Sequence, residues 1–518
     1  MRKSLFILLI FLYCSDNTFA QYKNVMISNL NTPEEVGISI DPKNPDHIVA
    51  ASNIDNYYYS TDGGYTWSWG QINSSFGVWG DPVVVVDTNS AFYYFHLSNA
   101  GAIGGSWVDR MVCQKVNFIG GSWSDGTTTG KNGTKVQDKP GVAMDRKNNN
   151  IYITWTQFDT YGSTALTDSS IILFSRSIDG GNTWSNPTRI NNLAGDCRDN
   201  DSTVEGAIPA VGPNGEVYVS WAGPLGIVFN RSFDLGKTWM SSNTFVTSIP
   251  GGWDYNIPGI YRCNGLPYTN CDVSNGPHRG TIYISWSDQR NGIDNTDVWI
   301  VKSTDSGNTW SAPVKVNDDA TRSQQFMSSM TIDQANGDIY VLFYDRRNYT
   351  DDNTDVYLAR SSDGGNTFKN FRISTSPFYP TTGAFFGDYT AITAHNGFVR
   401  PMWTRLDTAH LSVWTAIIDS SLSADNMQLN NNSSFSAYPN PFSPTAYMSY
   451  ELDDKEQVSL FVADIFGRTV AIIRNNEILP RGKYVDRFDA NQFGLPPGIY
   501  CFYLHAGDHT QVQKMVLK

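Results

Sequence analysis

The sequence predicts an all-β protein built mainly from repeated four-stranded units. Three observations support this prediction: a phrase of eight residues recurs five times, strand-like runs flank every copy, and a second strand-turn-strand phrase recurs upstream. The 518 residues are 40% hydrophobic and 17% charged, which excludes a disordered or fibrous chain and leaves length for several cores. We therefore expect a globular protein with more than one folded unit.

The eight-residue phrase has the form Ser-x-Asp-x-Gly-x-Thr-Trp. Its copies are Ser60–Trp67, Ser177–Trp184, Ser232–Trp239, Ser303–Trp310 and Ser361–Phe368. Aspartate and glycine supply the side-chain hydrogen bonds and positive φ angles of a tight turn, so each copy is expected to connect two strands of a hairpin. The aspartates interpreted in this way, as turn formers and not as catalysts, are Asp62, Asp179, Asp234, Asp305 and Asp363.

Upstream of each turn, an apolar strand, a polar turn and a strand rich in Tyr and Trp recur, as in Gly141–Asp145 followed by Ile151–Trp155. Together the two phrases predict a four-stranded meander. Seven such units begin near Glu35, Asp81, Asp138, Glu205, Asp254, Phe326 and Asp388. The last unit has three strands and ends at Ile418, so Tyr22–Leu30 is expected to add its fourth strand and close a ring.

The turn phrase resembles the Asp-box, or BNR repeat, of sialidase-like β-propellers, and with its flanking strands it covers residues 22–420. The unit count and this resemblance predict a seven-bladed β-propeller over residues 21–420. Sialidases have six blades, and six is the alternative.

Both ends of the chain carry segments outside the repeats. Residues 1–20 are typical of an export signal, with Arg2 and Lys3 before an apolar run and small residues before cleavage ahead of Gln21; a lipoprotein signal at Cys14 is the alternative. Residues 421–434, rich in Ser and Asn, are typical of a linker. Beyond residue 20, no apolar run approaches the roughly 18 residues of a membrane span.

Residues 435–518 are expected to form a small Ig-like β-sandwich. The phrases Tyr438–Phe442, Leu460–Arg468, Pro497–Tyr500 and Lys514–Lys518 occur there in an order that resembles the C-terminal sorting domain of the type IX secretion system. The resemblance implies that type IX machinery is a partner of residues 435–518. It also implies export across both membranes of a Gram-negative bacterium, to the medium or the cell surface. An ordinary Ig-like accessory module is the alternative.

Charge and cysteine content restrict the partners and cofactors. The net charge of −13 makes a nucleic-acid partner unfavourable. Five cysteines follow the leader, and Cys263 with Cys271, which enclose a short turn-rich segment, are the expected disulfide. The cysteines and the scattered histidines lack metal-ligand spacing, so no metal or other cofactor is expected. The acidic loops Asp294–Asp297 and Asp351–Asp355 could still hold calcium.

The ligand site is expected where the first strands of the units begin, because these ends converge on a funnel around the ring axis. Residues expected there are Asp81, Asp138, Lys139, Glu205, Asp254, Tyr255, Gln325, Asp388 and Tyr389. Glu205 is the glutamate expected to face the funnel, since Glu216 belongs to a turn on the far face. A solvated loop carboxylate is the alternative for Glu205.

In the sialidases that this repeat resembles, a glutamate polarises a tyrosine nucleophile, an aspartate handles the proton and three arginines clamp the substrate carboxylate. The resemblance casts Glu205, Tyr389 and Asp81 as catalytic. It casts Arg290, Arg347 and Arg405 as substrate-binding, together with Asp138, Lys139, Asp254, Tyr255 and Asp388.

The arginines have a competing structural interpretation. Arg290 and Arg347 lie in the phrases Asp288–Asn291 and Asp345–Asn348, which repeat in adjacent units. Repetition favours an architectural brace, whereas one catalytic centre needs residues unique to one unit.

Two classes of function follow from these observations. One is a secreted carbohydrate-active enzyme, either a sialidase-like glycoside hydrolase or a polysaccharide lyase. The other is a non-catalytic surface propeller for adhesion or protein binding. The fold alone does not decide between them.

Overall fold

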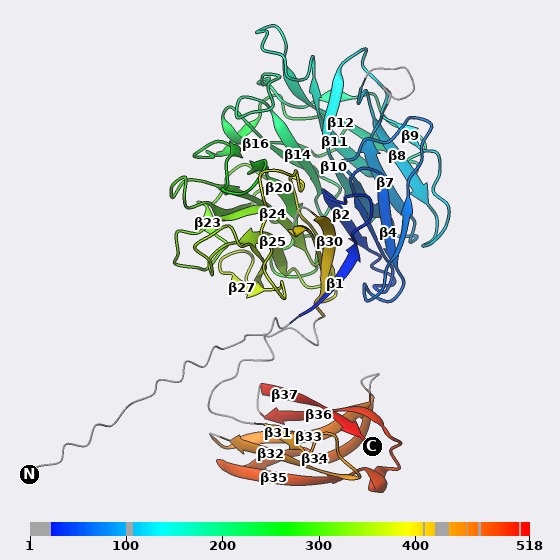
Figure 1. The fold of residues 1–518 in the computed structure, drawn as a ribbon, viewed down its shortest axis with the longest axis vertical. Coiled ribbons are helices and arrows are strands. Elements are labelled where there is room, and N and C mark those ends of the chain that lie inside the picture. Colours follow the sequence, from blue (N-terminus) through cyan, green and yellow to red (C-terminus); the bar gives the residue numbers. More distant parts are fainter. Residues whose placement is uncertain are drawn as a thin grey trace, which may run out of the picture. The chain divides into compact units, whose positions relative to one another are not determined.

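The computed structural model describes residues 22–99, 107–407, 410–419, 435–452, 454–464, 468–506 and 509–518. The chain folds into two compact units, Met1–Ile418 and Asp419–Lys518, and the expectation of an all-β protein is confirmed (Figure 1). The expected leader, residues 1–20, and the expected linker, residues 421–434, lie outside the described residues. No helix of the described part is long and apolar enough to cross a membrane.

The described residues of the larger unit form seven four-stranded antiparallel sheets. Sheet by sheet, starting each time from the strand that comes first in the repeat, the strands are β2 (Val36–Ile40), β3 (Ile48–Ser52), β4 (Asn56–Ser60), β5 (Ser68–Gln71); β6 (Val83–Val86), β7 (Phe92–Leu97), β8 (Met111–Val116), β9 (Thr127–Thr128); β10 (Val136–Met144), β11 (Ile151–Phe158), β12 (Ser170–Ser177), β13 (Thr188–Arg189); β14 (Glu205–Val211), β15 (Val217–Gly223), β16 (Gly226–Ser232), β17 (Thr244–Thr247); β20 (Tyr268–Cys271), β21 (Ile282–Asp288), β22 (Asp297–Ser303), β23 (Val314–Lys315); β24 (Gln325–Ile332), β25 (Ile339–Asp345), β26 (Asp355–Ser361), β27 (Lys369–Arg372); and β28 (Ala391–His395), β29 (Phe398–Asp407), β30 (His410–Ile417), β1 (Lys23–Ser28).

The first strands of the seven sheets line the middle of the unit. They pack against one another in the order β2, β6, β10, β14, β20, β24, β28 and back to β2, which closes a ring. In Figure 1 the strands β2, β10, β14, β20 and β24 lie nearer the middle of the unit than the outer strands β9, β23 and β27. Consecutive four-stranded sheets in a closed ring are the arrangement of a β-propeller.

The ring closes through the N-terminal strand. β1 pairs antiparallel with β30, from Lys23 opposite Ile417 to Ser28 opposite Val413. This is the position that the sequence predicts for Tyr22–Leu30. The last sheet therefore combines both ends of the unit, and β30 is left without an open edge.

Large side chains of the second strands hold neighbouring sheets together. The fully buried tryptophans are Trp155, Trp221, Trp286 and Trp403, on β11, β15, β21 and β29. Trp286 packs in one cluster with Tyr218 and Phe229 of the preceding sheet. The aromatic residues of these strands are thus used mainly as the core between sheets.

The five repeated turns share one set of hydrogen bonds. In the first, Ser60 Oγ donates to Asp62 Oδ1 at 2.8 Å, and the backbone N–H and hydroxyl of Thr66 donate to the two oxygens of Asp62 at 2.9 and 2.6 Å. The same contacts recur at Asp179, Asp234, Asp305 and Asp363. The aspartate therefore binds the groups that shape the turn connecting the third and fourth strands.

The fifth unit begins later than the sequence predicts. Its first strand is β20, which starts at Tyr268, and not a strand near Asp254. Asp254 lies instead in β18 (Asp254–Tyr255), which pairs with β19 (Cys263–Asn264) as a separate two-stranded sheet. This small hairpin occupies the connection between two sheets, so the repeat period is interrupted there.

The smaller unit consists of two sheets around one hydrophobic core. One sheet contains β31 (Ser436–Tyr438), β32 (Thr445–Leu452) and β35 (Gly482–Asp489). The other contains β34 (Thr469–Leu479), β33 (Glu456–Asp464), β36 (Gly498–Ala506) and β37 (His509–Leu517); the short 3-10 helix η3 (Ala490–Phe493) follows β35. Residues of both sheets, including Met448, Phe502 and Met515, form the core.

Two of the C-terminal phrases meet in this unit. Phe442 receives a hydrogen bond from Lys518 N at 3.0 Å and donates its own backbone N–H to Val516 at 2.8 Å. The phrase Tyr438–Phe442 is therefore held by the last strand, β37.

Candidate functional site

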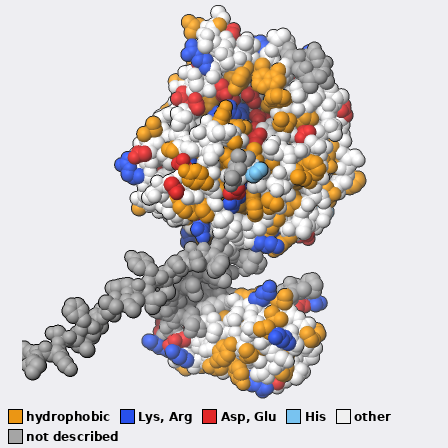
Figure 2. Space-filling view, viewed as in Figure 1, with side chains coloured by type: hydrophobic (Ala, Val, Ile, Leu, Met, Phe, Trp, Pro, Cys, Tyr) orange, Lys and Arg blue, Asp and Glu red, His pale blue; other side chains and the backbone are white. Residues whose placement is uncertain are grey.

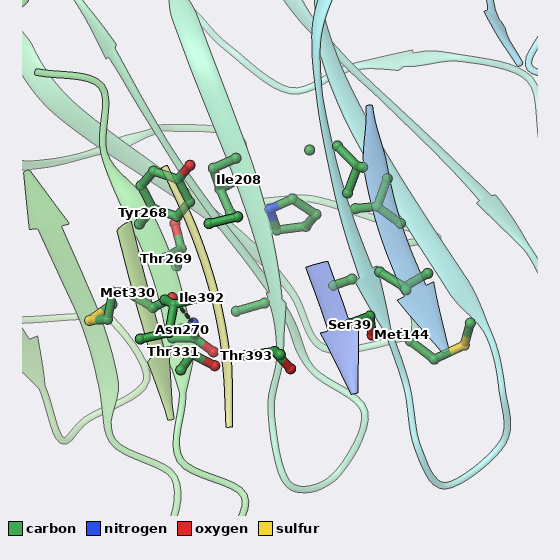
Figure 3. Close-up of a pocket in the computed structure, with 18 of the residues that line it drawn as sticks. Ser39, Met144, Ile208, Tyr268, Thr269, Asn270, Met330, Thr331, Ile392 and Thr393 are labelled. Atoms are coloured by element: carbon green, nitrogen blue, oxygen red, sulfur yellow. Dashed lines mark hydrogen bonds between the residues drawn. The ribbon is translucent and has the colours of Figure 1, made fainter. Parts of the chain in front are cut away.

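A cavity of about 740 Å³ lies in the middle of the ring and is lined by the first strands of all seven sheets. Ile208, Met330 and Ile392 belong to its wall, together with small polar residues such as Ser39 and Thr393 (Figure 3). The wall of the cavity is therefore largely apolar along its length. Charged groups line it where the first strands begin, and others, among them Lys43, Arg146 and Lys147, line it where those strands have ended.

Eight charged residues meet at that end and are called the axial cluster here: Glu35, Asp81, Asp138, Lys139, Asp199, Glu205, Arg262 and Asp388. Figure 2 shows acidic and basic side chains together in a hollow of the larger unit, with hydrophobic side chains around it. The cluster brings together six carboxyl groups and two cations.

Asp388 lies between the two cations. Its carboxylate receives a hydrogen bond from Lys139 Nζ at 2.8 Å and is bound at both oxygens by Arg262, whose Nε lies 2.9 Å from Oδ1. Although burial opposes ionisation, Lys139 and Arg262 lower the pKa of Asp388 to about 2. Asp388 is therefore ionised throughout the neutral range and engages both cations.

Lys139 also faces two further carboxylates. Its Nζ lies 3.5 Å from Glu35 Oε1 and 3.7 Å from Asp81 Oδ2. Although burial favours the neutral amine, Asp388, Asp81 and Glu35 raise the pKa of Lys139. The ammonium group is the local counter-charge for three carboxylates.

Glu34 and Glu35 are joined through Asn53. The amide of Asn53 donates to Glu35 Oε2, and its oxygen accepts the backbone N–H of Asp81 at 2.7 Å. Burial, and then the charges of Asp81 and Asp388, raise the pKa of Glu34 to about 8, against the lowering effect of its hydrogen bond with Asn53. Glu34 therefore holds its proton at neutral pH.

Within the axial cluster, the charged neighbours of Glu205 are Asp199 and Asp138. It is 1% exposed, and no N–H or O–H group among the described residues donates to either of its carboxyl oxygens. Burial, and then the charges of Asp199 and Asp138, raise the pKa of Glu205 well above its usual range. Glu205 is therefore a buried acid that favours its protonated form. Its neighbour Asp199 accepts a 2.6 Å hydrogen bond from the hydroxyl of Tyr161.

Asp138 differs from Glu205 because it is partly exposed to solvent. Burial, and then the charge of Asp81, raise its pKa to about 7, although Lys139 acts against them. Asp138 is the member of the cluster that combines access to solvent with a pKa close to neutral, as a general acid requires.

Left-handed backbone recurs where the first strands begin. The φ angles there are 48° at Glu35, 51° at Asp81, 49° at Lys139, 70° at Gly206 and 49° at Met327. For residues other than glycine this conformation costs roughly 1–2 kcal/mol each. The ring thus holds strain at the end where its charged side chains collect, as functional sites often do.

The structure places the other predicted funnel residues in different ways. Tyr389 is partly exposed beside the cluster, with Lys139 Nζ 5.5 Å from its ring centre; burial, and then Asp81 and Glu35, raise the pKa of Tyr389. Gln325 is buried and bonds Asp345 at 3.3 Å. Tyr255 is also buried, where its hydroxyl contacts Ser287, and Asp254 is exposed in the small hairpin.

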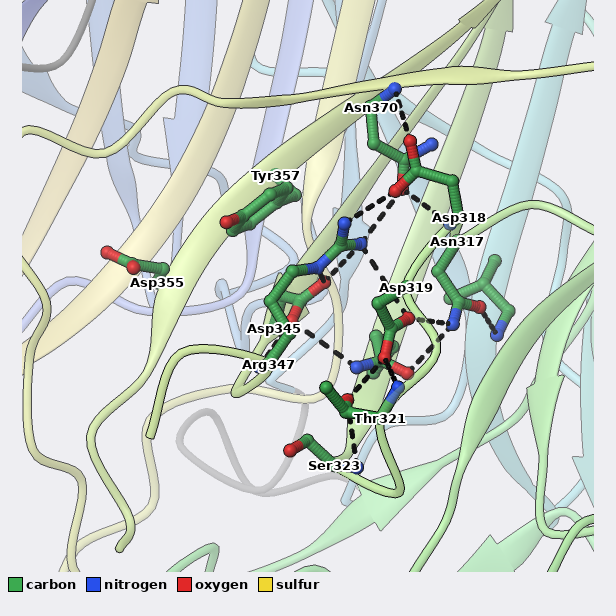
Figure 4. Close-up of polar contacts among 12 residues, drawn as sticks. Asn317, Asp318, Asp319, Thr321, Ser323, Asp345, Arg347, Asp355, Tyr357 and Asn370 are labelled. Carbon is green, nitrogen blue, oxygen red and sulfur yellow. Dashed lines mark hydrogen bonds and ion pairs between the residues drawn. The ribbon is translucent and has the colours of Figure 1, made fainter. Parts of the chain in front are cut away.

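The three arginines of the expected clamp do not line the cavity. Arg290 binds Asp288 at 2.6 Å and covers the ring of Trp299, whose centre lies 4.4 Å from the guanidinium. Arg347 binds Asp345 at 2.7 Å and Asp318 at 2.5 Å (Figure 4). These contacts support the brace interpretation over a substrate clamp.

Arg405 is likewise used within the last sheet. It is 7% exposed, pairs with Asp407 at 3.0 Å and donates to the backbone oxygens of Ser376 and Pro377, both at 3.1 Å. Its guanidinium is therefore fully engaged by the protein.

The expected disulfide is wrong. Cys263 and Cys271 are free thiols, like the other described cysteines. Cys263 pairs with Tyr255 in the small hairpin, whereas Cys271 belongs to β20, so the two side chains enter different hydrophobic clusters. A segment that looked like a single loop is divided between two sheets.

No group of three His, Cys, Asp or Glu side chains in the described ranges is placed to hold a metal ion. In the loops considered for calcium, Asp294 pairs with Arg322 at 2.9 Å, Asp352 with Arg346 at 2.9 Å, and Asp355 accepts from Ser374 at 2.8 Å. Protein donors occupy these carboxylates.

Sequence reasoning missed three of the eight residues of the axial cluster. Arg262, Asp199 and Glu35 were not assigned to the site, nor was Tyr161, which contacts it. The double glutamate at Glu34 and Glu35, at the start of the first unit in a chain with few glutamates, is the signal that could have indicated Glu35.

Comparison with known proteins identifies the smaller unit. Residues 436–518 match the model of the secretion system C-terminal sorting domain. The protein is therefore exported through the type IX secretion system, to the cell surface or the medium, as the sequence predicts. No curated protein matches the chain.

Several solved structures are similar to the larger unit at low identity. A polysaccharide lyase of family PL25, an ulvan lyase, matches with a TM-score of 0.47 and 11% identity, over 77% of this chain and 96% of the lyase. The NanB sialidase from Streptococcus pneumoniae gives 0.44 and 9%, over 73% and 84% of the two chains. An α-L-arabinofuranosidase from Fusarium graminearum gives 0.42 and 14%, over 63% and 93%.

Proposed function

We propose that the chain is an exported glycoside hydrolase that cleaves neutral polysaccharides at the axial cluster of a seven-bladed β-propeller. The C-terminal sandwich, which we take to be Ig-like, serves its export. One observation carries the proposal: carboxyl groups from several sheets are held together at one end of the axial cavity, and one of them, Asp138, is half-buried and keeps part of its surface accessible. Glycoside hydrolysis needs such a pair of carboxyls, one protonated and one ionised.

The residues have distinct roles in this proposal. Asp138 is the general acid that protonates the leaving oxygen, and Asp81, paired with Lys139 at 3.7 Å, is the second carboxyl of the pair. Glu205 is too deeply buried to touch substrate, so it acts as a positioning residue that keeps a proton close to Asp138. Tyr389 lies beside Lys139 and is available for contact with the sugar.

The charge balance supports a neutral substrate. Six carboxyls face two cations, and both cations bind Asp388. A sialic acid or uronate would bring another carboxylate beside these groups, where Arg262 is already bound to Asp388. The three arginines expected as a carboxylate clamp are engaged elsewhere, since Arg290, Arg347 and Arg405 pair with carboxylates of their own sheets. A sialidase or a lyase acting on uronates is therefore less well supported than a hydrolase of neutral chains.

The test is a screen of the full-length chain for reducing-end release from neutral polymers (arabinan, galactan, xylan, mannan) and acidic ones (alginate, polygalacturonate, sialyllactose). We expect release from a neutral polymer and a loss of about 10²-fold or more in Asp138→Asn, with Asp294→Asn as the matched control. Release from acidic polymers alone, or full activity of Asp138→Asn, contradicts the proposal. Binding without release favours the non-catalytic propeller.

A further inference from the structure

Exposed aromatic rings form a platform beside the axial cluster. Trp79 and Trp107 are 39% and 40% exposed and meet edge to face, with ring centres 5.7 Å apart. Trp107 in turn meets Tyr161 at 5.8 Å. Tryptophan is among the largest apolar side chains, and leaving two of them exposed in contact with one another is unfavourable unless something covers them.

The backbone holds this platform in place. Val108, next to Trp107, has a φ angle of 46°, which is a strained conformation for a β-branched residue. Its carbonyl accepts the backbone N–H of Gln137, at the start of β10, at 2.9 Å. The chain therefore keeps Trp107 at the surface by a fixed and costly local structure.

The platform is joined to the axial cluster by direct contacts. Tyr161, which packs on Trp107, donates its hydroxyl to Asp199 at 2.6 Å, and Asp199 lies 3.6 Å from Arg262. A ligand on the tryptophans would therefore reach the charged groups without leaving the protein surface.

A second aromatic pair contacts Arg262. The guanidinium covers the ring of Phe385, whose centre is 5.1 Å away, and Phe385 meets Tyr261 edge to face at 6.0 Å. Tyr261 is 60% exposed. This pair comes from the connections before β20 and β28, whereas the tryptophans flank β6 and β7, so the two platforms belong to different sectors of the ring.

We propose that Trp79 and Trp107 on one side, and Tyr261 and Phe385 on the other, are two sugar-binding subsites that hold an internal stretch of a neutral polysaccharide across the axial cluster. Sugar rings present C–H faces that pack on aromatic rings and hydroxyls that bond nearby polar groups, so they suit platforms beside charged residues. The inference rests on the proposed function and deepens it: the enzyme cuts within chains and depends on chain length.

The test is affinity electrophoresis of the full-length protein in gels containing arabinan, galactan, xylan or mannan. The variants are Trp79→Ala with Trp107→Ala, and Tyr261→Ala with Phe385→Ala. Phe233→Ala, which alters a 62% exposed aromatic residue in one of the repeated turns, is the matched control. We expect one of the polymers to retard the wild type and the control, and each double variant to bind that polymer at least tenfold more weakly.

A second measurement separates this inference from the proposed function. On an aryl glycoside that occupies only the cleavage position, both double variants should keep wild-type kcat/KM, while their rate on the polymer falls. If the variant with Trp79 and Trp107 both replaced by alanine does not fold, as judged by circular dichroism, the single variant Trp107→Leu is measured in its place. Unchanged retardation of the variants overturns the subsites and leaves the hydrolase intact. A wild type that no polymer retards overturns the subsites as well, and the release assay then decides the hydrolase separately.

Discussion

The aspartates of the repeated turns and Asp138 of the axial cluster carry the same chemical group in opposite states. Asp305 receives hydrogen bonds from Ser303 Oγ at 2.8 Å and from the Thr309 hydroxyl and N–H at 2.6 and 2.9 Å, and these bonds lower its pKa to about 2. Asp138 is desolvated and faces Asp81, and its pKa rises to about 7. Surrounding donors fix the negative charge in one region, whereas surrounding carboxyls retain the proton in the other.

This difference shows how one residue type serves both architecture and chemistry in the same ring. The turns repeat, because each needs only its own neighbours in sequence. The axial cluster does not repeat, because its residues come from different sheets and meet only after the ring has closed.

Removal of the central cation should have the largest effect on stability. Lys139→Met leaves Asp388, Glu35 and Asp81 without their shared counter-charge, and we expect a loss of about 3–5 kcal/mol in unfolding free energy at pH 7, measured by urea denaturation. The loss should shrink at pH 5, where the remaining carboxyls can take up protons. An equal loss at both pH values would contradict the view that these carboxyls compete for one cation.

Disruption of a single repeated turn should lower the unfolding free energy by less than the loss of Lys139 does. Asp305→Ala removes the acceptor for three donors at a largely exposed site, and we expect a loss of about 1–2 kcal/mol in unfolding free energy. Asp294→Ala is the control: Asp294 pairs only with the exposed Arg322, and the change should not be measurable. Equal losses of unfolding free energy in Asp305→Ala and Asp294→Ala would contradict the view that the turn aspartate stabilises the fold.

The pH dependence of stability should have opposite signs in the two regions. The raised pKa values of Asp138 and Glu34, about 7 and 8, mean that the folded state binds more protons than the unfolded chain, so stability should fall as pH rises from about 5 to 8. The lowered pKa values of Asp234, Asp305 and Asp363, about 2, contribute stability above about pH 4 that is lost as pH falls towards 2.

The melting temperature between pH 5 and 8 measures this effect. Glu34→Gln should flatten its fall, and Glu216→Gln, in the turn between β14 and β15, should not. A melting temperature that rises over this range in the wild type would reverse the sign and contradict the assignment of protons to the axial carboxyls.

The repeated features of the fold could be predicted from the sequence because their causes are local. Asp62 binds residues within four positions, and the strand period around it repeats, so turn, hairpin and sheet follow from short segments. The closing strand, β1, was also predictable, since the last unit lacked one strand. The small hairpin of β18 and β19 was not, because it interrupts the period between two units.

The candidate site was only partly predictable for the same physical reason. Asp81, Lys139, Glu205 and Asp388 belong to strand starts and could be expected near the axis. Arg262 and Asp199 lie in long connections whose path no repeat specifies, and these two residues decide which carboxyls are neutralised. The arginines expected to bind substrate form ion pairs instead with carboxylates two residues away in sequence.

The central claim is that Asp138 of the axial cluster and the neighbouring Glu34 hold protons near neutral pH while the turn aspartates do not. Infrared difference spectroscopy of the protonated-carboxyl band, recorded as pH rises from 5 to 9, measures this directly. The account predicts a band that persists at pH 6 and weakens between about pH 6.5 and 9, that is weaker in Asp138→Asn and Glu34→Gln, and that is unchanged in Asp305→Ala. Loss of the whole band below pH 5 in the wild type would contradict it.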